Sequence, residues 1–500
     1  MNNELLKNVS EEICETARQM AGKTSAVSAE WKPLRAPGFV SDADRDARKV
    51  FKTFFDWTKL TVSSKYVDFD GNGTFFNTLN SRVTFPLPTG ESGEVAICHD
   101  QSLPDQWTFT RNYHHAWYFK DIDFGNLDPN EIWMRFDSVA HYCVVFVNGK
   151  QAGSHIGGYT PFEFNISPFL NSGKNTIALF VVDEVAVMDR VKKRAISQLD
   201  NGVGSINSHY AGIRGGIYFE SRPKIHISRI RVKTSTRNKV IEVESWMRGG
   251  NSDVTLKHEV FEWPNGSRPV LTLPEISAKS SLDSAVTNSL KIEWSSKIME
   301  GGFSYPPLKG CRGLENPRSV EEKMHRDYYE TTSKASASWP DPKLWSPVHP
   351  NLYVLRTTMT CNGISETVET RFGFREFWIE GKQFMLNGKP IRLFGDGSHQ
   401  FGFRSVVPGY SIEYGKKSFE FLKNEFNIMS VRLHGLTYPQ WAILAADEAG
   451  ILVINQNGLR HGRVEMYEEG KDEFIRNMEL QTEEWYWRDA NSPSVVIWDE

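Results

Sequence analysis

The sequence predicts a multidomain protein in which two all-β sandwiches precede a segment of parallel βα units. The 500 residues are several times the usual size of one domain. Up to about residue 375, short runs of β-branched and aromatic residues alternate with turn signals, which is typical of antiparallel sandwiches. After that point apolar strands alternate with amphipathic helices, as in parallel βα units.

Composition and charge exclude several classes of protein. Hydrophobic residues make up 39% of the chain and charged residues 24%, which is the balance of a globular protein rather than of a disordered one. The 58 Lys and Arg residues are outnumbered by 62 Asp and Glu residues, so no basic excess could neutralise a nucleic-acid backbone. No run approaches the ~18 apolar residues of a membrane helix. We therefore expect no nucleic-acid and no membrane partner.

The first 23 residues mix acids and bases where a secretory signal would need an uninterrupted apolar run. The five cysteines are scattered and odd in number, without the spacing of zinc ligands, which suits free thiols in a reducing compartment. We therefore expect a cytoplasmic protein. The alternative is a periplasmic or secreted protein whose signal peptide has been removed.

Two sandwiches are expected after a short lead. Residues 1–30 predict a weakly amphipathic helix and a linker, and residues 31–224 predict a β-sandwich or jelly roll. In this first sandwich the apolar residues Ile132, Met134 and Phe136 have period two. An apolar run then enters Asn148-Gly149, a dipeptide that suits a type I′ hairpin.

Residues 225–375 have the size of an immunoglobulin-like sandwich with an insertion. The insertion, residues 277–340, is rich in Ser, Lys, Gly and Pro and has no sustained period. We therefore expect a long loop there.

Residues 376–500 predict four βα units. The expected strands are 391–394, 428–433, 451–454 and 495–498, and the expected helices are 417–426, 441–449 and 472–489. A (β/α)₈ TIM barrel takes roughly 250 residues, so only its first half would fit. Half a barrel would leave an apolar parallel edge uncovered. We therefore expect the chain to be the front part of a longer protein; the alternative is a small α/β domain that packs this edge on another chain.

Polar side chains gather where these strands are expected to end, which is where barrel enzymes hold their active sites. In chain order they are Asp396, His399, Arg432, His434, Asn455 and Gln456. Donors and acceptors on one face suit a ligand rich in hydroxyl groups, since each hydroxyl both donates and accepts. The pattern predicts a sugar-like site.

Each of these residues has a structural alternative. A guanidinium on a buried sheet needs a carboxylate, so Arg432 should meet one that belongs either to the protein framework or to a reacting centre. His399 and His434 could be held by loop carbonyls. Asp396, between two glycines, could cap a turn.

Motifs along the chain resemble those of glycoside hydrolase family 2, the β-galactosidase, β-glucuronidase and β-mannosidase group. The first sandwich carries AWYFK at 116–120, VNGK at 147–150 and GIRGGIY at 212–218. The second carries LWSP at 344–347, PNLY at 350–353 and FGFR at 372–375. The last segment carries FMLNGKP at 384–390, FNIMSVR at 426–432 and RDANSPSVVIW at 488–498. The family order, a sugar-binding jelly roll, an immunoglobulin-like sandwich and a (β/α)₈ barrel, is the order expected here.

The resemblance implies an exo-acting retaining β-glycosidase. In that reaction one carboxylic acid protonates the leaving oxygen while a second carboxylate, ~5–5.5 Å away, attacks the anomeric carbon. The family pattern places the acid/base five residues after Trp498, just past Glu500, and the nucleophile further on, so the 500-residue chain alone is expected to be inactive. Arg432 would orient the nucleophile, and the two histidines with Asn455 and Gln456 would bind sugar hydroxyls.

Departures from the family pattern concern the substrate. The chain has GDGSH at 395–399 in place of an RGxNxH-type loop, and Asn455-Gln456 in place of an Asp-Glu pair. The glutamate that binds magnesium in β-galactosidases has no counterpart near His461, so we expect no such metal site and no cofactor. A non-catalytic carbohydrate-binding or scaffold protein with a degenerate barrel is the alternative function. The sugar, the linkage and any homo-oligomer stay open.

Overall fold

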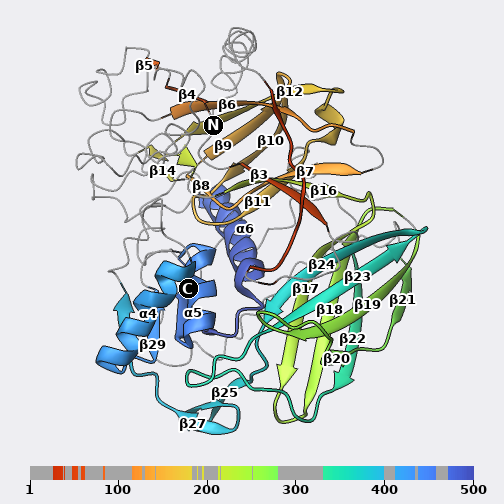
Figure 1. Cartoon of the computed structure of the whole chain (residues 1–500). Coiled ribbons are helices and arrows are strands. Elements are labelled where there is room, and N and C mark those ends of the chain that lie inside the picture. Colours follow the sequence, from red (N-terminus) through yellow and green to blue (C-terminus); the bar gives the residue numbers. More distant parts are fainter. Residues whose placement is uncertain are drawn as a thin grey trace.

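The computed structural model describes most of the two sandwiches and of the βα segment (Figure 1). The described residues are 26–37, 39, 48–53, 58–61, 83–84, 115–126, 130–140, 142–182, 188–189, 194–195, 212–213, 216–250, 252–279, 330–398, 412–433, 437–457 and 471–499. The lead helix expected in residues 1–30 lies almost wholly outside them. Among the described residues, none of the helices combines the length and the apolarity needed to span a bilayer.

The first sandwich consists of two facing sheets. One sheet has the order β10-β9-β12-β6-β4-β5 with β1 on β6, and the other has the order β11-β7-β16-β3-β2. The strands are β1 (Val27–Ser28), β2 (Lys32–Pro33), β3 (Lys49–Thr53), β4 (Thr58–Thr61), β5 (Val83–Thr84), β6 (His115–Asp123), β7 (Glu131–Phe136), β9 (Tyr142–Val147), β10 (Lys150–Ile156), β11 (Phe162–Asn165), β12 (Lys174–Val182) and β16 (Ile217–Arg222). Smaller elements are β8 (Val139–Ala140), β13 (Met188–Asp189), β14 (Arg194–Ala195), β15 (Gly212–Ile213) and the 3₁₀ helix η2 (Ser167–Phe169).

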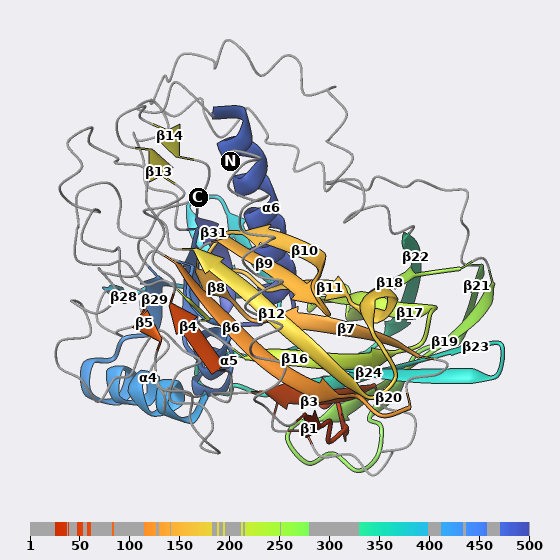
Figure 2. The same ribbon diagram turned by 90° about the horizontal axis from the view of Figure 1, so that it is seen from above.

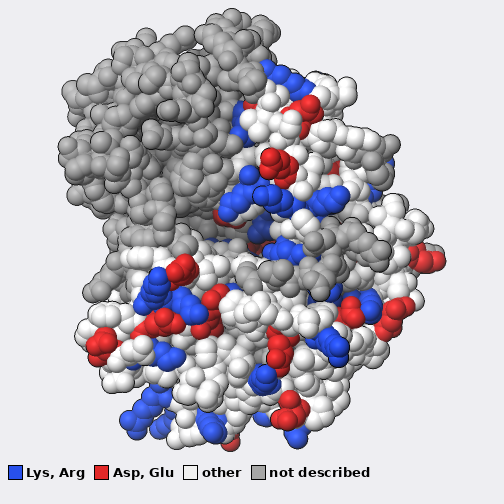
Figure 3. Space-filling view, in the orientation of Figure 1, with Lys and Arg blue, Asp and Glu red and all other residues white. Residues whose placement is uncertain are grey.

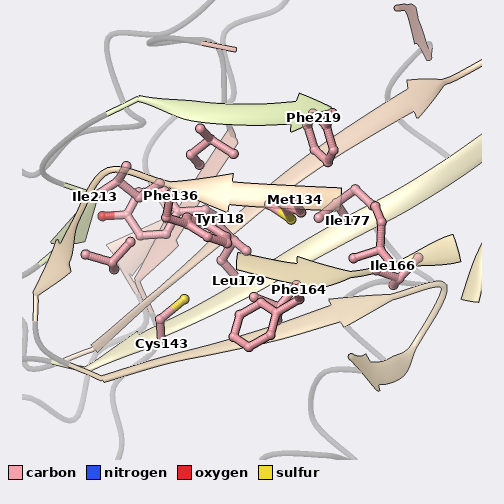
Figure 4. Close-up of a cluster of buried hydrophobic side chains, with 14 of the residues drawn as sticks. Tyr118, Met134, Phe136, Cys143, Phe164, Ile166, Ile177, Leu179, Ile213 and Phe219 are labelled. Carbon is pink, nitrogen blue, oxygen red and sulfur yellow. The ribbon is translucent and has the colours of Figure 1, made fainter. Parts of the chain in front are cut away.

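The predicted period-two strand and the predicted hairpin are both confirmed. Ile132, Met134 and Phe136 of β7 are buried in one hydrophobic core that also contains residues of the facing sheet. Figure 4 shows Met134 and Phe136 among the side chains that fill this core. Asn148 and Gly149 have φ angles of 51° and 79°, and they join β9 to β10 as an asparagine–glycine turn requires.

The second sandwich packs a sheet of order β17-β18-β22 against one of order β20-β19-β23-β24, with β21 on β19. Its strands are β17 (His226–Ser235), β18 (Val240–Arg248), β19 (Asp253–Glu262), β20 (Leu271–Thr272), β21 (Ile276–Lys279), β22 (Glu330–Ser338), β23 (Tyr353–Cys361) and β24 (Ile364–Phe372). The prediction of a loop over residues 277–340 is wrong at both ends. Strand β21 lies at the beginning of this range and pairs with β19, and β22 lies at its end and pairs with β18. The small residues of β22 carry little β-propensity, so pairing with β18 decides their conformation. Residues 280–329 lie outside the described part.

The βα segment begins with a hairpin and continues into a parallel sheet of order β28-β29-β30-β31. The hairpin strands are β25 (Phe377–Glu380), β26 (Gln383–Leu386) and β27 (Lys389–Ile391). The sheet and its helices are β28 (Gly395–Ser398), α4 (Ile412–Phe426), β29 (Ser430–Leu433), α5 (Gln440–Ala449), β30 (Leu452–Gln456), α6 (Lys471–Asp489) and β31 (Val495–Asp499). The predicted alternation of strands and helices is confirmed.

The first strand of this sheet lies further along the chain than predicted. Residues 391–394 were expected to form it, but Ile391 ends the hairpin and the glycine-rich residues 395–398 form β28. Glycine has low β-propensity, which is why the pattern predicts a loop there. A Cβ atom on Gly395 would lie 2.2 Å from the carbonyl oxygen of Ser430, so close approach of β28 to β29 requires glycine at this position.

The two faces of the parallel sheet differ. On one face Val431, Leu433 and Val453 pack with Phe419 of α4 and Ala446 of α5 in one buried cluster. On the opposite face Leu452 of β30, near the amino end of the sheet, packs with Trp345 and with Leu386 of the hairpin. The carboxyl half of that opposite face, which carries Arg432, Gln456 and Asp499, is called the open face below.

Helix α6 lies between the two sandwiches, in the middle of Figure 1 and beside β9 and β10 in Figure 2. Its side chains contact both: Glu484 reaches His155 of the first sandwich, and Glu483 reaches Arg229 of the second. In Figure 3, cationic and anionic side chains are interspersed over the described lower part of the visible face.

Candidate functional site

The strand register sorts the predicted site residues onto the two faces of the parallel sheet. In neighbouring strands, paired residues point to the same side, and the side alternates along each strand. Arg432 pairs with Ile454, which pairs with Ile497, and two residues further along Gln456 pairs with Asp499. Arg432, Gln456 and Asp499 therefore share the open face.

An ion pair crosses the carboxyl ends of these strands. The Nε atom of Arg432 on β29 donates to Oδ2 of Asp499 on β31 at 2.7 Å. The Arg432 side chain is 41% exposed and that of Asp499 is 27% exposed, so both groups keep contact with solvent. Gln456, on the strand between them, is buried. The open face thus carries a partly exposed cation and anion on its outer two strands and a buried amide on the strand between them.

Arg432 was predicted to meet a carboxylate, and in the structure it meets that of Asp499. Asp499 itself was not among the predicted site residues. Asp499 comes directly after the fourth expected strand, so the strand-end rule points to it as well.

Asn455 lies on the other, helix-covered face. It pairs with Leu433 and Trp498, its side chain is fully buried, and its Nδ2 atom donates to Oδ2 of Asp489 at 2.9 Å. The structure therefore gives Asn455 an internal contact with α6, and its position lends no support to the predicted binding of sugar hydroxyls.

Asp396 also points to the helix-covered side, because it pairs with Val431. It is exposed, since β28 is the outermost strand of the described sheet. The alternative role as a turn cap does not fit, because Asp396 lies inside β28. Its predicted role in sugar binding stays a prediction. Sequence spacing alone could not give the face, which depends on the register of β28 against β29.

His399, His434, His461 and Glu500 lie outside the described residues, so their predicted roles stay predictions. Within the described ranges, no group of three or more His, Cys, Asp or Glu side chains is arranged to hold a metal ion.

Buried groups hold the start of β31 in place. Asp447 of α5 accepts hydrogen bonds at Oδ1 from the backbone nitrogen of Ser494 at 3.1 Å and from its Oγ at 2.6 Å. The Nη2 atom of Arg371 lies 3.4 Å from Oδ2 of Asp447. Burial raises the pKa of Asp447 to about 6, and the nearby Arg371 opposes that rise.

Arg375 fixes the same segment from the side of the second sandwich. Its Nε donates to the carbonyl oxygen of Pro493 at 3.0 Å and its Nη2 to that of Val495 at 2.5 Å. Burial lowers the pKa of Arg375 to about 10. This residue ends the FGFR motif, so the motif joins the second sandwich to the strand that carries Asp499.

Comparisons with known proteins agree with this architecture. The sequence matches the family model "Glycosyl hydrolases family 2, sugar binding domain" over residues 96–190 and the model "Glycosyl hydrolases family 2" over residues 312–375. A putative beta-glucuronidase of Formosa agariphila is 24% identical over 393 residues, which cover 77% of this chain and 39% of the relative. A beta-galactosidase of Thermoanaerobacterium thermosulfurigenes is 24% identical over 374 residues, which cover 73% of this chain and 43% of the relative.

Solved structures share the fold. A GH2 beta-galacturonidase from Eisenbergiella tayi has a TM-score of 0.61 at 19% identity, over 90% of this chain and 65% of that one. A beta-glucuronidase from Bacteroides uniformis has a TM-score of 0.59 at 18% identity, over 90% of this chain and 46% of that one.

The β-sandwiches and the short α/β segment after them form a multidomain fold like that of glycoside hydrolase family 2. Both matched models are those of glycoside hydrolase family 2, and the chain is similar to β-galactosidases and β-glucuronidases. These matches confirm the resemblance inferred from the motifs. The chain spans 39% and 43% of the length of the two curated relatives named above, less than half of each.

Proposed function

We propose that this chain is part of an exo-acting retaining β-glycosidase, and that residues 376–500 are the first half of its (β/α)₈ barrel. In this proposal residues 31–224 are the sugar-binding sandwich and residues 225–375 the immunoglobulin-like one. A parallel sheet whose described helices α4 and α5 pack on one face is what part of the wall of such a barrel would present.

One observation carries the proposal: the Arg432–Asp499 pair, with its 2.7 Å contact, stands on the open face at the carboxyl ends of parallel strands. In a closed barrel this face would line the interior, and the strand ends would form the mouth where active sites lie. A partly solvated guanidinium and carboxylate can exchange their mutual contact for sugar hydroxyls at small cost, since exposed ion pairs contribute little stability.

The reaction would use two carboxylates from outside the described residues. We place the acid/base just past Glu500 and the nucleophile further along the complete protein. Arg432 would then lie near the nucleophile and keep it ionised, because a neighbouring positive charge lowers the pKa of a carboxylic acid. His399 and His434 would bind sugar hydroxyls.

The proposed substrate is a terminal β-linked hexose or hexuronic acid. Support comes from relatives named beta-glucuronidase and beta-galactosidase and from the solved beta-galacturonidase that is bound to galacturonate. The substituted residues at 395–399 and Asn455-Gln456 argue against transferring the lactose-type activity unchanged.

The test is an assay of the complete gene product on aryl β-glucuronide, β-galacturonide, β-galactoside, β-mannoside and β-glucosaminide. Release of the aryl group from one of them, with retention of the anomeric configuration in the first-formed sugar, is expected. No hydrolysis of any of these aryl glycosides, together with no cleavage of oligosaccharides, would contradict the proposal.

A second candidate is a non-catalytic carbohydrate-binding protein with a degenerate barrel. It is favoured by the fact that Arg432 already meets a carboxylate of the protein, so it needs no reacting one. The gene sequence downstream of codon 500 separates the two: an Asn-Glu pair a few codons on supports the glycosidase, and a stop codon supports the binding protein.

A further inference from the structure

The loop between β10 and β11 of the first sandwich rests on helix α6. The Oγ1 atom of Thr160 donates to Oε2 of Glu484 at 2.6 Å, and Nε2 of His155 lies 3.0 Å from the same oxygen. One turn further along α6, Nη1 of Arg488 donates to the carbonyl oxygen of Tyr159 at 3.2 Å. The loop therefore contacts α6 at two successive turns of the helix.

Close packing fixes the position of this loop along the helix. Gly157 has a φ angle of +129°, and a Cβ atom added to it would lie 2.6 Å from Cδ of Gln481. Gln481, Glu484 and Arg488 have the spacing i, i+3 and i+7, which puts them on one stripe of the helix. A shift of the loop would therefore disturb the whole stripe.

A buried ion pair continues from this stripe into the parallel sheet. Nε of Arg488 donates to Oδ1 of Asp489 at 2.8 Å and Nη2 donates to Oδ2 at 2.6 Å. The two side chains are 3% and 0% exposed. The Oδ2 atom of Asp489 also accepts a hydrogen bond from Nδ2 of Asn455 at 2.9 Å. A buried pair of this kind costs the most when only one partner is removed, because the other charge stays buried.

The contacts end at the part of β30 that lies between Arg432 and Asp499. Asn455 immediately precedes Gln456, which shares the open face with the ion pair. The next residue, Asn457, donates its backbone nitrogen to the carbonyl oxygen of Asp499 at 2.8 Å and its Nδ2 to Oγ1 of Thr482 on α6 at 3.0 Å. Helix α6 thus holds the end of β30 through two side chains.

We propose that Arg488 and Asp489 are positioning residues, through which the first sandwich sets the carboxyl end of β30 at the open face. The positioning itself is independent of the proposed function; only its consequence for glycoside hydrolysis rests on that function. Neither residue touches the open face, because Arg488 reaches Tyr159 and Asp489 reaches Asn455 on the helix-covered side.

The first test is backbone hydrogen exchange in the full chain, read on the segment 452–457. Asp489→Asn and Arg488→Lys are expected to speed its exchange about tenfold, since each weakens a buried, charge-assisted contact. Gly157→Ala, a change in the first sandwich, is expected to do the same by pushing the loop away from Gln481. Glu483→Gln is the matched control, because it faces Arg229 of the second sandwich across 3.5 Å and should leave this segment unchanged.

Equal exchange in the control and in all three variants would overturn the proposal. So would a uniform rise over the whole chain in every variant, since that is loss of stability rather than local release. If Asp489→Asn does not fold, the exchange of Arg488→Lys is the deciding measurement. This variant keeps the positive charge but loses the paired hydrogen bonds of the guanidinium to Asp489.

The second test uses the complete gene product on the glycoside that it cleaves. Arg488→Lys is expected to lower kcat about tenfold with little change in KM, and Glu483→Gln to keep both. A loss confined to KM would contradict positioning of the reacting end. If the unmodified protein cleaves no glycoside, the proposed function fails, while the exchange measurement still decides the positioning.

Discussion

Replacement of Asp447 by asparagine should change how the stability of the chain depends on pH. The carboxyl group of Asp447 is buried beneath the start of β31, and burial raises its pKa from 3.8 to about 6. The folded state therefore holds this proton more tightly than the unfolded state does. Because the pKa of Asp447 is higher in the folded state, its contribution to the free energy of unfolding is greatest below pH 4. That contribution is lost as the pH rises through about 6.

The magnitude follows from the shift. A displacement of about two pKa units corresponds to ~3 kcal/mol of folding free energy, at ~1.4 kcal/mol per unit. The Arg371 guanidinium at 3.4 Å and the two bonds from Ser494 favour the ionised form, and burial outweighs them. Further charged groups near Asp447 in the described part of the chain are Arg375 and, next along α5, Glu448, which pairs with Arg371.

The assay is urea unfolding of the chain and of Asp447→Asn between pH 4 and pH 7. The free energy of unfolding of the parent, minus that of the variant, should fall by up to ~3 kcal/mol across this range. Glu413→Gln is the control, since Glu413 is exposed and Lys417 lowers its pKa, which gives the opposite sign. Parallel curves for the parent and Asp447→Asn would refute the reasoning.

Three further predictions concern the sheet. Asp499→Asn breaks a partly exposed ion pair, so the unfolding free energy should fall by less than ~1 kcal/mol. The activity of the complete gene product should fall about a hundredfold. A large loss of stability with unchanged activity would contradict a role for Asp499 in the sugar site. Gly395→Ala forces a Cβ atom against the carbonyl oxygen of Ser430, so the unfolding free energy should fall by ~1–3 kcal/mol. Gly397→Ala is the control and should be near neutral, because no atom lies within 4 Å of its added Cβ. Equal unfolding midpoints for the two variants would disprove the close approach at Gly395. Arg375→Met removes two charge-assisted bonds, one to Pro493 just before β31 and one to Val495 at its start, so denaturant unfolding should show a loss of ~2–4 kcal/mol. An unchanged midpoint would show that this anchor contributes nothing.

Local patterns predicted much of the fold because the features that they report are local. The period-two residues of β7 and the asparagine–glycine turn after β9 depend on neighbouring residues in the chain, and both are as expected. The strand at residues 395–398 was missed for a physical reason: its glycines have low β-propensity, and only the approach of β29 makes them necessary. The same holds for β22, whose conformation comes from pairing with β18.

The site was only partly readable from the sequence. Strand ends can be located from pattern, but the face of each residue depends on register, and neighbours such as Asn455 and Gln456 point to opposite sides. The contact of Arg432 with a carboxylate was expected from the cost of burying a charge, whereas its partner on β31 was not. Contacts of α6 with the first sandwich join residues more than 300 positions apart, and no local pattern reports them.

The central claim is that a sugar binds on the open face, at the strand ends that carry Arg432 and Asp499. Its most direct test is a structure of the complete gene product with the glycoside, or its product sugar, bound. The account predicts the sugar over the carboxyl ends of β29, β30 and β31, with Arg432 beside a carboxylate near the anomeric carbon. A sugar bound elsewhere, or an open face sealed by other parts of the protein with Arg432 turned away from the ligand, would contradict it.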